Sequence, residues 1–194
     1  MEIHVEHLYK SYDGVPVLRD VTFTVGSGVT CVMAPSGGGK TTLLRILLGL
    51  ETADSGTAAG TNCRWAAVFQ EDRLLGHLDA AGNLRFALGK QYDAARAAGM
   101  LAELGLGDVG GKAVRDFSGG MGRRLALGRA LLADSDALAL DEPFAGLDGE
   151  MRRRAREVLR RHAGEKPVLL VTHDEADVAA LDAQIVRLAR VRTE

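Results

Sequence analysis

Residues 34–42 combine flexible positions with one lysine and two hydroxyls, in the order Ala-Pro-Ser-Gly-Gly-Gly-Lys-Thr-Thr. Glycines let backbone N–H groups turn towards phosphate oxygens, and a helix that begins directly after them adds a positive dipole. Lys40 supplies a mobile charge for β- and γ-phosphates, and the Thr41 hydroxyl suits Mg²⁺. The segment predicts a phosphate-binding loop made by Ser36, Gly37, Gly38, Gly39, Lys40, Thr41 and Thr42.

One position of this loop departs from the usual pattern G-x-x-x-x-G-K-[ST], because Ala34 stands where the first glycine is expected. A methyl group is tolerable there only if the φ angle stays negative. An ordinary glycine-rich turn would account for residues 37–39. It gives no reason for Lys-Thr-Thr to open a helix, so phosphate binding is the favoured interpretation.

Two adjacent carboxylates, Asp141 and Glu142, follow the apolar run Ala-Leu-Ala-Leu. Successive side chains of a strand point in opposite directions, so the two carboxylates should serve different purposes. Asp141 can hold Mg²⁺ through water, while Glu142 can polarise the water that attacks a γ-phosphate. Without the phosphate-binding loop, Asp-Glu-Pro after a strand would favour a helix-initiating turn, and the loop decides for the catalytic interpretation.

The segment Phe117-Ser118-Gly119-Gly120-Met121 resembles the signature sequence of ATP-binding cassette (ABC) proteins, usually written L-S-G-G-Q. A helix-forming stretch, 123–132, lies between it and Asp141, which is similar to the family's arrangement. The resemblance extends from Tyr12 to His173, in the family's order. It takes in the adenine-stacking aromatic Tyr12, the Q-loop glutamine Gln70, the D-loop aspartate Asp148 and the switch histidine His173.

The resemblance implies a role for each of these residues. Lys40, Gln70, Glu142 and His173 form the catalytic set, and Thr41, Gln70 and Asp141 hold Mg²⁺. Ser118, Gly119, Gly120 and Asp148 belong to the surface that closes over the ATP of a second protomer. Four of the residues also have a purely structural interpretation. Tyr12 could cap a small core, and Gln70 could be a strand-end amide bonded to backbone. His173 could be structural, and Ser118 could begin an ordinary N-capped helix.

Three signature positions depart from the family, since Phe117 and Met121 replace leucine and glutamine and Gly122 stands where a polar residue is usual. The segments 68–75 and 118–132 resemble the cassettes of nitrate, sulfonate and taurine importers. The stretch between Lys40 and Gln70 is short for the family, as though a hairpin had been trimmed.

The elements that position these residues follow from hydrophobic periodicity. Alternation in 3–8 and 21–25 predicts two antiparallel strands around a turn at Asp13-Gly14. Short apolar runs predict strands covered on both faces at 29–34, 65–69, 137–140, 168–171 and 185–188. Helices are expected at 43–50, 92–104, 123–132 and 152–162.

The predicted fold is therefore an α/β P-loop NTPase core, a mostly parallel sheet flanked by helices. An N-terminal antiparallel β part and an inserted helical subdomain complete it. The expected core is 1–73 and 133–194, and the helical subdomain is 74–132 and ends in the signature helix.

Composition limits the classes of partner and compartment. Among 194 residues, 24 basic and 26 acidic side chains leave a net charge of −2, so no global field favours nucleic acid. Cys31 and Cys63 lack metal-ligand spacing and are expected as buried free thiols in a reducing cytosol.

No signal peptide or run of about 18 apolar residues is present. We expect a cytoplasmic protein, peripheral on the inner face of the cell membrane.

The leading hypothesis is an ATPase, with ATP as substrate and Mg²⁺ as cofactor, that powers a bacterial importer. Its expected partners are a second copy of itself or a related cassette, integral-membrane permease subunits and an extracytoplasmic substrate-binding protein. One alternative is a non-transport ABC ATPase, a clamp in DNA repair or on the ribosome. Another is a degenerate regulatory cassette, supported by Ala34 and Met121.

Overall fold

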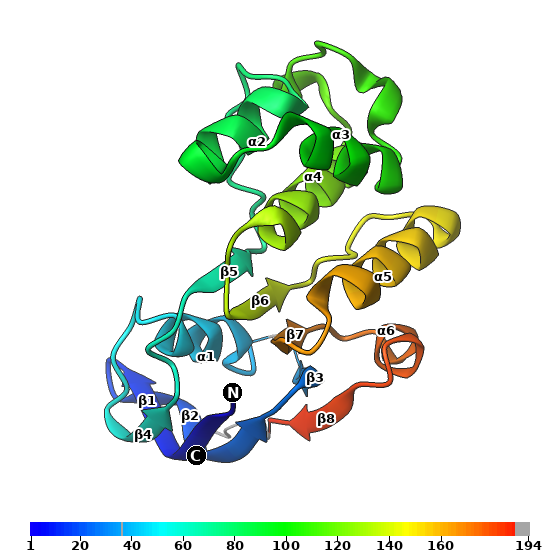
Figure 1. Cartoon of the computed structure of the whole chain (residues 1–194). Coiled ribbons are helices and arrows are strands. Elements are labelled where there is room, and N and C mark those ends of the chain that lie inside the picture. The colour runs from blue at the N-terminus through cyan, green and yellow to red at the C-terminus, as the bar shows by residue number, and fades with distance from the viewer. Residues whose placement is uncertain (36, 189–194) are drawn as a thin grey trace. The chain divides into compact units, whose positions relative to one another are not determined.

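The computed structural model describes residues 1–35 and 37–188 (Figure 1). They form two compact units. The first contains Met1–Trp65, Asp136–Asp141 and Glu165–Glu194, and the second contains Ala66–Ser135 and Glu142–Gly164. The boundaries predicted at residues 74 and 132 stay a prediction.

An antiparallel sheet in the first unit has the strand order β2-β1-β4. β1 (Ile3–Tyr12) and β2 (Val15–Val25) pair around a turn at Asp13 and Gly14, which both adopt positive φ. This confirms the predicted antiparallel pair. β4 (Ser55–Ala59), which pairs with the other edge of β1, was not predicted.

A parallel sheet in the same unit carries the strands with the catalytic candidates at their ends. β3 (Gly28–Met33), β6 (Ala137–Asp141), β7 (Pro167–Val171) and β8 (Gln184–Arg187) follow in the order β6-β7-β3-β8. Every residue of β6 and β7 is buried, as the apolar runs predict. Parallel pairing brings the carboxyl ends of these strands to one edge, where ligands bind in open α/β sheets.

β8 contradicts one expectation, because it is not covered on both faces. Ile185 is 44% exposed, and only Val186 is partly covered within the strand. β8 comes last in the strand order of the sheet, so within residues 1–35 and 37–188 it pairs with a strand on one side only. Its apolar residues reflect strand propensity rather than burial.

Two helices complete the first unit. α1 (Lys40–Leu47) begins at the end of the glycine-rich segment and buries Leu43, Leu44, Ile46 and Leu47. α6 (Glu175–Ala180) follows β7. The strand β5 (Trp65–Val68) begins at the end of the first unit and continues into the second. Both cysteines are free thiols, Cys31 buried and Cys63 half-buried.

The second unit is mainly helical. It contains α2 (Ala80–Leu88), α3 (Ala94–Glu103), α4 (Gly119–Leu132) and α5 (Gly149–Ala163), with 3-10 turns η1 (Gly89–Gln91), η2 (Gly107–Val109) and η3 (Val114–Asp116). Side chains of Leu84, Leu104 and Leu125 form its core. α3 packs so closely on α4 that a Cβ at Gly128 would lie 2.8 Å from Leu104. No helix in the described part of the chain is long and apolar enough to cross a membrane.

Candidate functional site

The phosphate loop, residues 34–42, joins β3 to the first turn of α1. Gly37 and Gly39 have φ angles of 75° and 80°, which glycine adopts without steric cost. The Gly38 amide donates to the Pro35 carbonyl at 2.9 Å. The Lys40 ammonium donates to the Ala34 carbonyl at 2.7 Å, which holds this charge inside the turn. Ser36 lies outside the described residues, so its predicted role stays a prediction.

The φ angle of Ala34 is not positive. This is the condition that the sequence set for a methyl group in place of the first glycine. The methyl group instead limits Gly38, where an added Cβ would lie 2.8 Å from the Ala34 Cβ. Gly39 is confined in the same way by β2, since an added Cβ would lie 2.6 Å from Leu18.

Thr41 and Asp141 lie together at the end of the phosphate loop. Asp141 is the last residue of β6 and is buried, and the Thr41 hydroxyl donates to its Oδ2 at 3.3 Å. Hydroxyl and carboxylate oxygens are the ligands that Mg²⁺ uses when substrate phosphates and waters complete its coordination. The two side chains therefore fit the predicted metal site.

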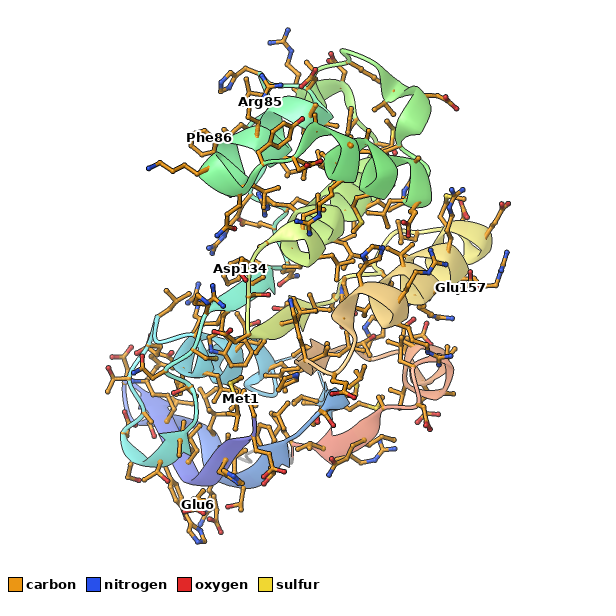
Figure 2. The ribbon with its side chains drawn as sticks, in the orientation of Figure 1. Met1, Glu6, Arg85, Phe86, Asp134 and Glu157 are labelled. Carbon is orange, nitrogen blue, oxygen red and sulfur yellow. The ribbon has the colours of Figure 1, made fainter. Side chains whose placement is uncertain are left out.

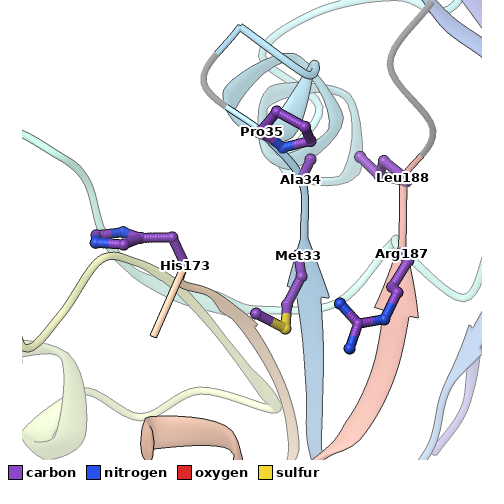
Figure 3. A pocket seen from close by; sticks show the side chains of 6 residues that line it. All are labelled: Met33, Ala34, Pro35, His173, Arg187 and Leu188. Carbon is purple, nitrogen blue, oxygen red and sulfur yellow. The ribbon is translucent and has the colours of Figure 1, made fainter. Parts of the chain in front are cut away.

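His173 lies two residues after the end of β7 and is exposed. Together with Met33, Ala34, Pro35, Arg187 and Leu188 it lines a pocket of about 300 Å³ (Figure 3). The predicted switch histidine and the start of the phosphate loop therefore line the same pocket.

A buried threonine fixes the turn that carries His173. The Thr172 hydroxyl donates to Asp177 at 3.1 Å and accepts the Asp174 amide at 3.1 Å. Sequence analysis missed Thr172, Asp177 and the pocket residue Arg187. The polar run from Thr172 to Glu175, directly after the apolar strand β7, was an available indication of the turn.

Glu142 follows Asp141 but belongs to the second unit. Its φ angle is 48°, which is uncommon for a residue with a side chain, and Pro143 comes next. Strained backbone of this kind collects at functional sites, where the surrounding structure holds it in place. The outlier supports the interpretation of Glu142 as a functional residue, and its role towards water stays a prediction.

The second unit brings the signature residues together with the segment before Asp148. Ser118 caps α4 by accepting the Met121 amide at 3.3 Å, and Asp148 caps α5 by accepting the Met151 amide at 2.9 Å. A Cβ added to Gly120 would lie 3.3 Å from the Gly146 carbonyl. Gly120 therefore allows the two helix starts to approach each other.

Two further predicted residues lie in separate places. Tyr12 ends β1 and is 40% exposed, with the Lys10 ammonium 5.2 Å from its ring centroid. The hydrogen bond that the Lys10 ammonium donates to the Glu51 carboxylate, assisted by Asp54, raises the pKa of Lys10. Gln70 is exposed and follows β5 in the second unit. Adenine stacking by Tyr12 and Mg²⁺ binding by Gln70 stay predictions.

Comparison with known proteins decides the family. The family model for the ABC transporter matches residues 18–145. The chain belongs to the ABC transporter family. Sequence analysis predicted this membership, which is confirmed.

Relatives with assigned names agree with this membership. An aliphatic sulfonates import ATP-binding protein of Pseudomonas syringae pv. syringae (strain B728a) is 35% identical over 189 residues, covering 96% of this chain and 79% of the relative. A taurine import ATP-binding protein of Yersinia pestis bv. Antiqua (strain Antiqua) is 34% identical over 203 residues, with the same coverage of 96% and 79%. The predicted resemblance to sulfonate and taurine cassettes is confirmed.

Solved structures confirm the predicted α/β fold. A dimeric ATP-binding cassette in a post-hydrolysis state, bound to ADP and Pi, superposes with a TM-score of 0.85 at 23% identity, covering 96% of this chain and 94% of the other. The ATP-binding subunit of an ABC transporter gives a TM-score of 0.86 at 24% identity, covering 98% and 87%.

Membership in the ABC family establishes the activity of the chain. The chain is an ATPase, and ATP is its substrate. The first unit supplies Lys40, Thr41, Asp141 and His173, while the second supplies Gln70, Ser118, Glu142 and Asp148. This ABC ATPase thus divides the predicted residues between two units.

Proposed function

We propose that this ABC ATPase powers a bacterial importer for small organic solutes and works as a head-to-tail dimer. The observation that carries the ATP-hydrolysing part of the proposal is the contact between Thr41 and Asp141 beside the phosphate loop, a pair of oxygen ligands next to Lys40. Relatives named for sulfonate and taurine import support the importer role.

The residues of the first unit hold the phosphates. Lys40 exchanges its contact with the loop carbonyls for the β- and γ-phosphates, and Thr41 with Asp141 holds Mg²⁺. Mg²⁺ held by these two side chains would supply positive charge that offsets the charge on the phosphates. His173 donates a hydrogen bond to the γ-phosphate from the end of β7.

Glu142 orients the attacking water so that the water lies in line with the phosphate bond that breaks to release ADP. It also accepts a proton from that water. Gln70 completes the metal site from the segment after β5. Tyr12 stacks on adenine. These assignments give each group one role in a single transfer of the γ-phosphoryl group to water.

Each protomer also completes the site of the other. The N-terminus of α4, with the Ser118 hydroxyl and the amides of Gly119 and Gly120, is an anion site without a lysine. We assign it to the γ-phosphate of the ATP bound to a second copy or a related cassette, with Asp148 beside it. Known dimeric cassettes support this arrangement.

The motor acts through other subunits. Its partners are permease subunits in the membrane and an extracytoplasmic substrate-binding protein, and its place is peripheral on the inner face of the cell membrane. Importer relatives favour this assignment over a clamp in DNA repair or on the ribosome.

The concentration dependence of hydrolysis tests the composite site. Mg²⁺-dependent ATPase activity should rise more than linearly with protein concentration, because a complete site needs two chains. A rate strictly proportional to concentration, with full activity in a demonstrated monomer, would contradict the proposal.

A further inference from the structure

Two arginines of α4 hold the main chain around Gln70. The Arg123 guanidinium donates to the carbonyls of Phe69, at 2.7 Å, and Gln70. Arg129 donates to the carbonyls of Arg73, at 2.7 Å, and Asp72, at 2.8 Å. The Gln70 segment, residues 69–73, is therefore fastened to α4 by side-chain donors.

Arg123 is the more enclosed of the two arginines. It is 8% exposed, and its Nε lies 3.2 Å from Oδ1 of Asp72. Burial raises the pKa of Asp72 above its usual value, although the charges of Arg123 and Arg129 act in the opposite direction. A planar guanidinium can donate to two carbonyls while its charge lies beside a carboxylate, which an ammonium cannot do in the same geometry.

Gly122 makes room for this arrangement. A Cβ added at this position would lie 2.8 Å from Oδ2 of Asp72. The departure from the usual polar residue at this position thus has a structural reason, because the Asp72 carboxylate occupies the space beside the helix. Gly122 and Asp72 form one side of the seat in which Arg123 lies.

The neighbouring Arg124 contacts different groups. It donates to the carbonyls of Leu104, at 2.7 Å, and Gly105, at 3.0 Å, and so ties α4 to the end of α3. Of these three arginines, Arg123 and Arg129 donate hydrogen bonds to the Gln70 segment, whereas Arg124 donates to the end of α3. All of these residues lie in the second unit.

We propose that Arg123 is a positioning residue that joins the Gln70 segment to the helix beginning at Ser118, with Asp72 and Gly122 shaping its seat. The metal-binding glutamine and the signature serine then move as one piece when ATP closes the dimer. This inference rests on the proposed roles of Gln70 and Ser118. Its consequence is that Arg123, without touching ATP, sets how well Gln70 meets Mg²⁺.

Gly122→Ala tests the seat without weakening the helix. Alanine is a better helix former than glycine, but its methyl group must displace the Asp72 carboxylate. Gly99→Ala in α3 is the matched control, because a Cβ there meets nothing within 4 Å. Arg123→Gln removes the guanidinium that donates to the carbonyls of Phe69 and Gln70. Arg123→Lys keeps the positive charge and shows whether charge alone preserves the parent Mg²⁺ requirement.

The deciding readout is the Mg²⁺ concentration that gives half-maximal ATPase activity. Gly122→Ala and Arg123→Gln should raise it roughly tenfold, the size of effect expected for a residue that orients a metal ligand. The KM for ATP and the midpoint of thermal unfolding of Gly122→Ala should stay near the parent values. Gly99→Ala should leave the Mg²⁺ requirement unchanged. An unchanged Mg²⁺ requirement in Gly122→Ala would overturn the proposal.

A double-mutant cycle separates positioning from general damage. Once Gln70 is replaced by Ala, Gly122→Ala should add little further increase in the Mg²⁺ requirement, because both changes act on the same contact. Fully additive effects would show that the seat does not act through Gln70.

Hydrogen exchange keeps the inference separate from the proposed function. The amides of residues 69–73 should exchange faster in Arg123→Gln than in the parent chain or in Gly99→Ala. Unchanged exchange would refute the tether even if the chain hydrolyses ATP as proposed. Faster exchange in a chain without Mg²⁺-dependent ATPase activity would support the tether and count against the catalytic proposal.

Discussion

The hydroxyl of Thr41 lies 3.3 Å from Oδ2 of Asp141, a contact between residues 100 positions apart in the chain. It joins the first turn of α1 to the end of β6. The phosphate loop and a buried carboxylate are thereby combined at one edge of the parallel sheet. On the function proposed above, the response of the ATPase to Mg²⁺ should depend on both partners.

Removing either oxygen should weaken the response to Mg²⁺. Thr41→Val and Asp141→Asn should each raise the Mg²⁺ concentration for half-maximal ATPase activity by roughly 10–100-fold. Thr41→Ser keeps the hydroxyl and should stay close to the parent chain. If Thr41→Val had the same Mg²⁺ requirement as Thr41→Ser, the hydroxyl would not contribute to the metal site.

The crowding at Gly38 predicts which changes the phosphate loop tolerates. Gly38→Ala should abolish ATP binding, because its Cβ would lie 2.8 Å from the Ala34 Cβ and 2.9 Å from the Pro35 carbonyl. Ala34→Gly should retain binding, since it only removes a methyl group. Fluorescent nucleotide titration measures both, and normal binding by Gly38→Ala would refute the steric account.

The sequence predicts those parts of the fold that have a local pattern. The run of apolar residues in β6 and β7 and the Lys-Thr-Thr helix start are examples. β4 has no such pattern, because Ser55–Ala59 holds small, mostly exposed residues that become a strand only by pairing with β1. Its position could not follow from hydrophobic periodicity.

The candidate site likewise has features with a local sequence pattern and contacts that have none. The phosphate loop around Lys40 could be predicted from its own segment, and it in turn decided the interpretation of Asp141 and Glu142. The contacts of Arg123 with the carbonyls of Phe69 and Gln70 could not, because they join segments more than 50 positions apart. Arginines in α4 fit a solvated helix face equally well in the sequence. Only the structure shows that Arg123 is buried.

Two apolar residues of α2 should differ sharply in their effect on stability. Leu84 is fully buried, whereas Phe86 is 72% exposed on the same helix (Figure 2). Leu84→Ala should lower the free energy of unfolding by about 2–5 kcal/mol, because it leaves a cavity. Phe86→Ala should change it by less than about 0.5 kcal/mol. Chemical denaturation measures both, and equal losses would contradict the assigned core.

The ion pair between Arg64 and Asp136 should make the first unit sensitive to acid. Hydrogen bonds from the Arg64 side chain, then from its amide, lower the pKa of Asp136 to about 2. An ordinary aspartate has a pKa of about 3.9. Because the folded-state pKa is lower, the stabilisation is present above about pH 4 and is lost as the pH falls towards about 2.

Asp136→Asn should remove this part of the pH dependence. Its free energy of unfolding should change less than that of the parent chain as the pH falls from about 4 to about 2. Denaturation at several pH values provides the measurement. Parallel curves for the two proteins would show that the pair does not contribute.

The central claim is that two chains share each ATP, with Glu142 as the group that activates water. Glu142→Gln should keep ATP binding but lower single-turnover hydrolysis by roughly 10²–10⁴-fold. Because ATP then persists, light scattering should show a stable dimer with Mg²⁺ and ATP and a monomer with ADP. A monomer in saturating ATP, together with hydrolysis at the parent rate, would contradict both the shared site and the role of Glu142.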